Sequence, residues 1–124
     1  LFVDDEEPLV DAARQILERI GYHVVVAADA FEALALFEPN PDAYDLIITD
    51  QTMPRMTGVE LATRLRVIRP DLPVVLCTGF SQTLTPERAA EMGLGFLMKP
   101  VNKTVLAAVV KKALGGRRGE AEQG

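Results

Sequence analysis

The chain has 124 residues, of which 48% are hydrophobic and 25% are charged, and its formal net charge is −5. These values are typical of one globular domain with its own core, and the negative charge gives no indication of nucleic-acid binding. The sequence shows no apolar run of membrane-spanning length and no signal peptide, so we expect no membrane contact. A single cysteine, Cys77, excludes an internal disulfide and a cysteine metal cluster and agrees with a reducing, cytoplasmic setting.

The first predicted strand covers residues 1–3 and ends at the acidic residues Asp4 and Asp5. A helix follows, with Pro8 in its first turn and Gly21 where a C-terminal cap belongs. Apolar residues at helical spacing predict one buried face of this helix. They are Leu9, Val10, Ala13, Ile16, Leu17 and Ile20.

The second strand is predicted over residues 22–27, which centre on three valines. Asp29 and Glu32 form a capping-box pattern that opens the second helix. This helix is expected to end before Pro39, because a proline disfavours helical backbone in the residue before it.

The third strand contains the apolar run 46–48 and stops near Asp50, because Pro54 cannot continue a ladder of strand hydrogen bonds. On this stretch alone, a ligand-binding carboxylate and a solvated turn aspartate are about equally good interpretations of Asp50. A second capping box, residues 57–60, opens a helix that runs to about residue 69. Its predicted buried residues are Leu61, Ala62, Leu65 and Ile68.

The rest of the chain continues this alternation of strands and helices. In order, the predicted elements are a strand over 73–78, a loop over 79–83, a helix from Thr85 to Gly93, a strand over 95–98, a turn at Lys99 and Pro100, and a helix from about Asn102 to Leu114. Gly115 and Gly116 are expected to end the last helix. We therefore predict one domain over 1–115 and a flexible, polar C-terminal tail over 116–124.

Five strands that alternate with helices predict an α/β fold, a parallel sheet with helices on both faces. Right-handed crossovers favour the strand order 2-1-3-4-5, which gives a flavodoxin-like three-layer (βα)5 sandwich. In that order, four adjacent strands would bring polar side chains to one edge of the sheet. These are Asp4, Asp5, Asp50, Thr78 and Lys99.

Such a pocket is suited to a divalent cation and a phosphoryl group. Two carboxylates ~4 Å apart repel by roughly 4 kcal/mol at an effective dielectric constant of 20, and a cation relieves this repulsion. An oxygen-only site suits Mg²⁺, and a cation together with Lys99 would neutralise a phosphoryl group. Asp50 would be the nucleophile and form an acyl phosphate, with Thr78 as a hydrogen-bond donor.

At these residues the chain resembles the receiver domains of bacterial two-component response regulators, over essentially all of residues 1–114. The matching features are the pair Asp4 and Asp5, Asp50 followed by Met53, Pro54, Met56 and Gly58, Thr78 after an apolar strand, and Lys99 followed by Pro100.

The resemblance implies that Asp50 accepts a phosphoryl group from a histidine kinase or a histidine phosphotransfer domain, with self-phosphorylation and self-dephosphorylation that depend on Mg²⁺. It implies Mg²⁺, which Mn²⁺ could replace, on Asp5, Asp50 and the Thr52 carbonyl, with Asp4 binding through water. Lys99 would pair with the phosphoryl group, and the Lys99–Pro100 peptide would be cis.

Phe96 falls where the family carries an aromatic switch residue, although a core phenylalanine is the alternative interpretation. If Phe96 is the switch residue, Thr78 would move toward the phosphate and Phe96 would turn inward to fill the space. This would change the surface of the fourth helix, fifth strand and fifth helix, through which the family often forms homodimers.

Other polar residues are expected to have ordinary roles. Glu6 and Glu7 favour the start of the first helix and are not expected to be ligands. His23 is expected to be structural or exposed, away from the site, and Cys77 to be inert packing. Thr52 and Phe80 lie where family members tune the lifetime of the phosphate.

Three alternative functions place different requirements on these positions. A haloacid-dehalogenase-type phosphatase needs a second acid where this chain has Thr52, and a flavin module needs a hydroxyl- and glycine-rich loop where it has acidic residues. A pseudo-receiver that only binds proteins would lack a key residue, and none is missing. The start at Leu1 without a methionine leads us to expect a piece of a longer protein, with the C-terminal receiver of a hybrid sensor kinase favoured over a stand-alone regulator.

Overall fold

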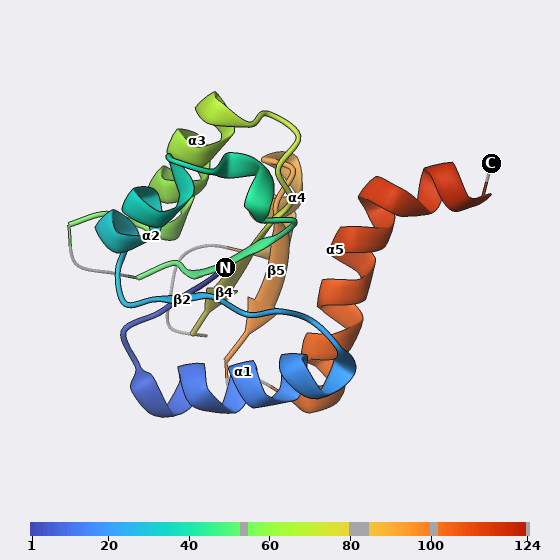
Figure 1. The fold of residues 1–124 in the computed structure, drawn as a ribbon, viewed down its shortest axis with the longest axis horizontal. Coiled ribbons are helices and arrows are strands. Elements are labelled where there is room, and N and C mark those ends of the chain that lie inside the picture. The colour runs from blue at the N-terminus through green and yellow to red at the C-terminus, as the bar shows by residue number, and fades with distance from the viewer. Residues whose placement is uncertain (53–54, 80–84, 100–101, 124) are drawn as a thin grey trace.

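The computed structural model describes residues 1–52, 55–79, 85–99 and 102–123, with the backbone alone for 115–123. Over these residues the chain forms a parallel sheet in the order β2-β1-β3-β4-β5 (Figure 1). The strands are β1 (Phe2–Val3), β2 (Val26–Ala27), β3 (Ile47–Asp50), β4 (Val74–Thr78) and β5 (Gly95–Met98). The predicted α/β fold class and strand order are therefore confirmed.

The helices follow the strands along the chain. They are α1 (Glu7–Ile20), α2 (Ala30–Phe37), α3 (Gly58–Ile68), α4 (Pro86–Glu91) and α5 (Lys103–Gln123), with a short 3-10 helix η1 (Pro41–Ala43) that the sequence did not predict. Gly21 ends α1 in the left-handed region at φ 116°. Thr57 and Glu60 make both hydrogen bonds of the capping box that opens α3.

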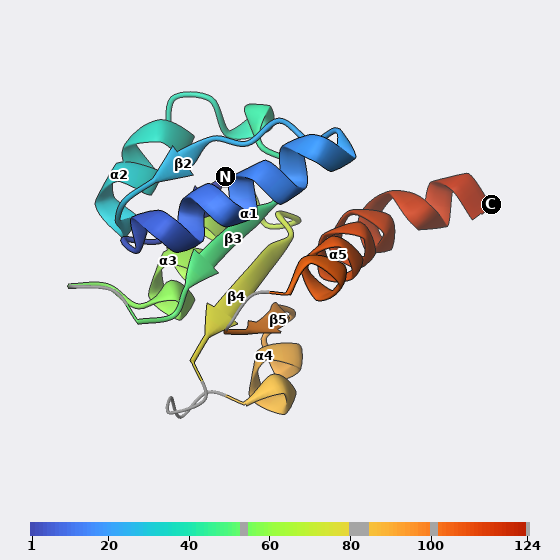
Figure 2. The same cartoon turned by 90° about the horizontal axis from the view of Figure 1, so that it is seen from below.

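The sheet separates two apolar clusters (Figures 1 and 2). One packs α2, α3 and α4 against one face of the sheet, with Phe37, Leu61 and Leu65 fully buried. The other packs α1 and α5 against the opposite face and includes Leu17 and Leu106. Because alternate residues of a strand point to opposite faces, neighbouring Ile47 and Ile48 belong to different clusters.

Arg66 ties three parts of the fold together from α3. Its Nε donates a hydrogen bond to the Leu72 carbonyl at 3.1 Å, and its two terminal nitrogens donate to the carbonyls of Met92 at 3.0 Å and Gly93 at 2.8 Å. Leu72 precedes β4, and Met92 and Gly93 lie just after α4. Burial lowers the pKa of the guanidinium below its usual value.

The structure corrects the predicted length of one strand. β2 covers Val26–Ala27 instead of residues 22–27, because its neighbour β1 pairs with it only through Phe2 and Val3. Residues 22–25 instead contribute to a pocket beyond this end of the sheet.

Three predictions about helices were wrong: the burial of Ile20, the burial of Ile68 and the end of the last helix. Ile20 and Ile68 are 48% and 39% exposed, because each is the last residue of its helix, where the buried stripe no longer faces the sheet. α5 continues past Gly115 and Gly116 to Gln123, and in both views its end extends away from the sheet (Figures 1 and 2). Glycine weakens a helix by about 1 kcal/mol per residue but does not forbid it.

In the described part of the chain, none of the helices has the length and apolar character needed to cross a membrane.

Candidate functional site

The carboxyl ends of four adjacent strands bring the predicted polar residues to one edge of the sheet. Asp4 follows β1, Asp50 ends β3, Thr78 ends β4 and Lys99 follows β5. The Lys99 backbone N–H donates to the Thr78 carbonyl at 2.7 Å, which continues the pairing of β4 with β5. This edge is where open α/β sheets bind ligands.

Three carboxylates meet at this edge. One oxygen each from Asp4, Asp5 and Asp50 lies within 4.8 Å of the others. Asp4 and Asp50 are 2% and 4% exposed, whereas Asp5 is open to solvent. Asp4 Oδ2 is buried, and among the described residues it forms an ion pair with Lys99 but no regular hydrogen bond. Hard, negatively charged oxygens with one open side are a suitable ligand set for a divalent cation such as Mg²⁺.

Lys99 supplies the positive charge of the site. Its Nζ lies 3.2 Å from Asp4 Oδ2, 3.4 Å from Asp50 Oδ2 and 3.1 Å from Glu6 Oε1. Burial on its own would lower the pKa of Lys99, but the hydrogen bond to Glu6 and the charges of Asp4 and Asp50 raise it above its usual value. The ammonium therefore stays charged at neutral pH.

The Asp50 carboxylate is under opposing influences. Burial raises its pKa above the ordinary value, and the nearby charge of Asp4 raises it further. Lys99 and the Thr52 backbone N–H, which donates to Asp50 Oδ1 at 3.4 Å, act in the opposite direction. A bound cation would add a second positive charge and favour the ionised form of Asp50.

Thr78 ends β4 at the acidic edge, whereas Phe96 lies further back on β5, where it pairs with Leu76 of β4. Thr78 is fully buried, and its hydroxyl has no hydrogen-bond partner among the described residues. Phe96 is half-buried, packs against the cluster of α2, α3 and α4, and lines a surface pocket between α4 and α5. The side chain of Thr52 is exposed, so only its backbone is held near Asp50.

Several predicted features lie outside the described residues. These are Met53, Pro54, Phe80 and Pro100, and with Pro100 the expected cis peptide. The roles given to the other site residues likewise remain predictions.

The connection from β3 to α3 is tightly packed at Gly58. The Gly58 N–H donates to the Gln51 carbonyl at 3.0 Å, and the Val59 N–H donates to Gln51 Oε1 at 2.9 Å. A Cβ atom at Gly58 would lie 2.6 Å from the Asp50 carbonyl oxygen. Gln51 was not singled out in the sequence, because a side chain that caps a helix eight residues later gives no local pattern.

Glu6 lies at the start of α1, as predicted, but it also makes a contact that the sequence did not predict. It occupies the N-cap position of α1, but its side chain makes no capping hydrogen bond and instead contacts Lys99. Its position directly after two acids at a strand end was the available signal. Glu7 does lie in the first turn of α1, as predicted.

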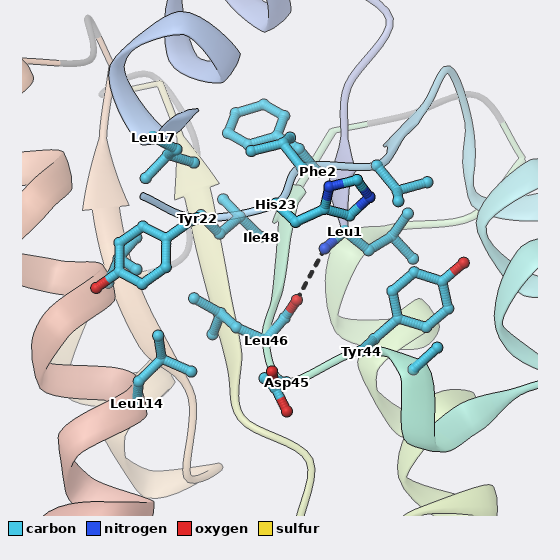
Figure 3. Close-up of a pocket in the computed structure, with 14 residues that line it drawn as sticks. Leu1, Phe2, Leu17, Tyr22, His23, Tyr44, Asp45, Leu46, Ile48 and Leu114 are labelled. Carbon is cyan, nitrogen blue, oxygen red and sulfur yellow. Dashed lines mark hydrogen bonds between the residues drawn. The ribbon is translucent and has the colours of Figure 1, made fainter. Parts of the chain in front are cut away.

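A second pocket, of about 170 Å³, lies at the opposite edge of the sheet (Figure 3). Leu1, Tyr22, Tyr44 and Leu46 are among the residues that line it, and they precede the strands instead of following them. His23, the one histidine of the chain, is exposed and lines this pocket, which confirms that it lies away from the acidic cluster.

Comparisons with known proteins agree with this geometry. The family described as "Response regulator receiver domain" matches residues 1–111. The chain is 34% identical over 121 residues to the alkaline phosphatase synthesis transcriptional regulatory protein PhoP of Bacillus subtilis, covering 97% of this chain and 49% of that protein. It is 32% identical over 115 residues to the sensor kinase CckA of Brucella abortus, covering 92% of this chain and 12% of that protein.

The fold is also similar to solved structures. A response regulator receiver domain protein from Clostridium thermocellum matches with a TM-score of 0.87 at 27% identity, over 94% of each chain. The chain thus covers nearly all of this receiver structure, but it spans less than half the length of each of the two curated relatives.

Proposed function

Because the chain belongs to the response regulator receiver domain family, we propose that it accepts a phosphoryl group on Asp50 within a two-component phosphorelay. Receiver domains interact with histidine kinases or histidine phosphotransfer proteins, and one of these would be the donor. The observation that carries the proposal is the convergence of Asp4, Asp5, Asp50 and Lys99 at one edge of the sheet.

The transfer is a substitution at phosphorus. A carboxylate oxygen of Asp50 forms a bond to phosphorus while the bond from phosphorus to the donor's imidazole nitrogen breaks. That nitrogen keeps the electron pair, and Asp50 becomes an acyl phosphate. Lys99, now 3.4 Å from Asp50 Oδ2, would pair with a phosphoryl oxygen and stabilise its negative charge.

The acidic residues fit the cation that such a transfer needs. Asp5, Asp50 and the Thr52 carbonyl, with Asp4 through water, would hold Mg²⁺, which supplies charge neutralisation at the phosphoryl oxygens. Among the described residues, the buried Asp4 Oδ2 forms an ion pair with Lys99 but no regular hydrogen bond, and its remaining capacity to accept one from metal-bound water supports this proposal. Mn²⁺ has similar ligand preferences and could replace Mg²⁺.

The switch would begin at Thr78. Its buried hydroxyl has no hydrogen-bond partner among the described residues, so a phosphoryl oxygen would give it one. Movement of Thr78 would open space for Phe96, which lies on the neighbouring strand in a pocket with Pro86 of α4 and Val109 of α5. The changed surface of α4, β5 and α5 would carry the output or form a homodimer.

We favour a receiver at the C-terminal end of a hybrid sensor kinase over a stand-alone regulator, with a cytoplasmic location. The similarity to sensor kinase CckA supports the hybrid arrangement, while the similarity to PhoP is as strong and fits a response regulator. A non-phosphorylated pseudo-receiver that binds partner proteins is the remaining candidate, and the following experiment separates it from a phosphoacceptor.

Incubation with acetyl phosphate and Mg²⁺ should add one phosphoryl group to the wild type, measured by intact mass. Asp50→Asn should abolish the adduct, because an amide is not a nucleophile at neutral pH, and removal of Mg²⁺ with EDTA should do the same. Asp45→Asn, which removes an exposed carboxylate before β3, is the matched control and should keep the adduct. An adduct that persists in Asp50→Asn would place the acceptor elsewhere, and its absence from the wild type would favour the pseudo-receiver.

A further inference from the structure

Among the described residues, the Lys99 ammonium has as many carboxylate neighbours as it has hydrogens to donate. A lysine carries three N–H donors and no acceptor, and Nζ faces Glu6 at 3.1 Å, Asp4 at 3.2 Å and Asp50 at 3.4 Å. The contact with Glu6 is the shortest of these and also satisfies hydrogen-bond geometry. A phosphoryl oxygen that approaches Lys99 would therefore compete with these carboxylates for its three N–H donors.

The proposed chemistry changes two of the three contacts. When Asp50 becomes an acyl phosphate, its carboxylate loses its charge, so Lys99 would exchange its ion pair with Asp50 for one with the phosphoryl group. Asp4 belongs to the carboxylate cluster that would hold the cation. Among the described residues, Glu6 is the Lys99 partner that lies outside this cluster, and the proposed chemistry forms no bond to it.

The backbone around Glu6 is arranged for this contact. The Glu6 N–H donates to Asp4 Oδ1 at 2.9 Å, which fixes the start of α1 relative to the acidic cluster. The Glu6 side chain makes no capping hydrogen bond to α1 and instead accepts a hydrogen bond from Lys99. We propose that Glu6 is a positioning residue that keeps the Lys99 ammonium over Asp50 while Asp4 and Asp50 change partners. This inference rests on the proposed phosphorylation of Asp50.

The first test compares Glu6→Gln with Glu7→Gln. Both variants remove one exposed negative charge at the start of α1, but Glu6 is the one that contacts Lys99. The probe is acetyl phosphate, which transfers its phosphoryl group to Asp50 as its P–O bond breaks and acetate leaves. At saturating acetyl phosphate and Mg²⁺, Glu6→Gln should lower the maximal rate of adduct formation by about two- to fivefold, the range expected for a partly exposed ion pair.

Loss of charge alone acts in the opposite direction. Less negative charge near the pocket favours an anionic donor, so Glu7→Gln should leave the rate unchanged or raise it slightly. A slower Glu6→Gln beside an unaffected Glu7→Gln is therefore not a general electrostatic effect.

A second readout follows Lys99 without any phosphoryl chemistry. Acetylation of lysine amines by an N-hydroxysuccinimide ester, mapped by peptide mass in Mg²⁺ buffer, reports how freely Lys99 moves. Glu6→Gln should raise acetylation of Lys99 several-fold over wild type, and Glu7→Gln should not. The exposed Lys103 and Lys111 serve as internal references.

The outcomes separate the two proposals. A wild type that forms no adduct overturns the proposed function. A wild type that forms the adduct while Glu6→Gln and Glu7→Gln behave alike in both readouts overturns the role of Glu6. Faster acetylation of Lys99 in Glu6→Gln without a slower transfer also overturns it, because Glu6 would then hold Lys99 without helping the reaction.

Discussion

Gly58 shows how a residue without a side chain shapes the site. Helix α3 begins against the end of β3, and only a hydrogen at this position fits beneath the Asp50 carbonyl. A Cβ atom would lie 2.6 Å from that oxygen and 2.9 Å from Leu76 Cδ2. The oxygen belongs to the backbone of a buried strand and cannot move aside without shifting Asp50.

Gly58→Ala should lower the free energy of unfolding by about 1–3 kcal/mol, the usual cost of overpacking. The higher helix propensity of alanine acts in the opposite direction, by up to about 1 kcal/mol. The sign of the change in unfolding free energy therefore tells whether the steric clash outweighs this gain. The measurement is urea unfolding. Gly79→Ala is the control, since a Cβ there meets none of the described residues within 4 Å. A more stable Gly58→Ala would show that β3 and α3 can separate easily.

The acidic site was largely predictable residue by residue, and the reason is topological. Asp4 and Lys99 follow apolar strands and Asp50 ends one, and parallel strands bring their carboxyl ends to one edge. Glu6 and Gln51 were not predicted in their observed roles, because each acts through a side chain that reaches a distant residue. Sequence spacing carries no information about such contacts.

At the scale of elements, the capping box of α3 makes stability depend on pH. The Thr57 backbone N–H donates to Glu60 Oε1 at 3.0 Å, and this bond holds the pKa of Glu60 below its ordinary value of 4.5. A carboxylate whose pKa is lower in the folded state stabilises the fold above its unfolded pKa. That contribution disappears as the pH falls through the lower, folded pKa.

Glu60→Ala should therefore destabilise the protein at pH 7, and the difference from wild type should shrink as the pH is lowered from 4.5 toward acid values. Thermal unfolding at a series of pH values would measure it. Glu18→Ala, at an exposed position of α1, is the control for loss of a surface glutamate. A difference that stays constant with pH would mean that the ionised carboxylate does not cap α3.

Elements were predicted well where a local signal marks their ends. Gly21, Thr57 and Thr85 mark helix ends that the structure contains. The length of β2 depends instead on how far β1 extends beside it, and that is a property of the sheet. The end of α5 was missed because a glycine pair lowers helix propensity without imposing a stop.

At the scale of the whole molecule, the acidic edge should link cation binding to stability. A cation that binds only the folded protein stabilises it by about 2.7 kcal/mol at 100 times its Kd. We expect Mg²⁺ to raise the melting temperature of the wild type and to do so much less in Asp5→Asn. Differential scanning fluorimetry against EDTA would show the shift.

The control for this measurement is Asp42→Asn, which removes another exposed negative charge, from η1. It should keep the full response to Mg²⁺. An equal response in Asp5→Asn would show that the cation acts elsewhere on the surface.

The three-layer architecture was predictable because the alternation of strands and helices leaves few parallel-sheet topologies. The arrangement of helices around the sheet then depends on contacts that no short motif encodes. Arg66 is the clearest example, since its partners lie 6, 26 and 27 residues further along the chain.

Arg66 has a mechanical consequence for the proposed switch. By holding the carbonyls of Met92 and Gly93, it fastens the C-terminal end of α4 to α3. Because α4 is short and held at this end, it would move by tilting about the Met92 end. A change transmitted from Thr78 would then displace the Pro86 end of α4 most and the Glu91 end least. The surface offered to a partner would change by a tilt of α4, with its largest amplitude at the end nearest the acceptor edge.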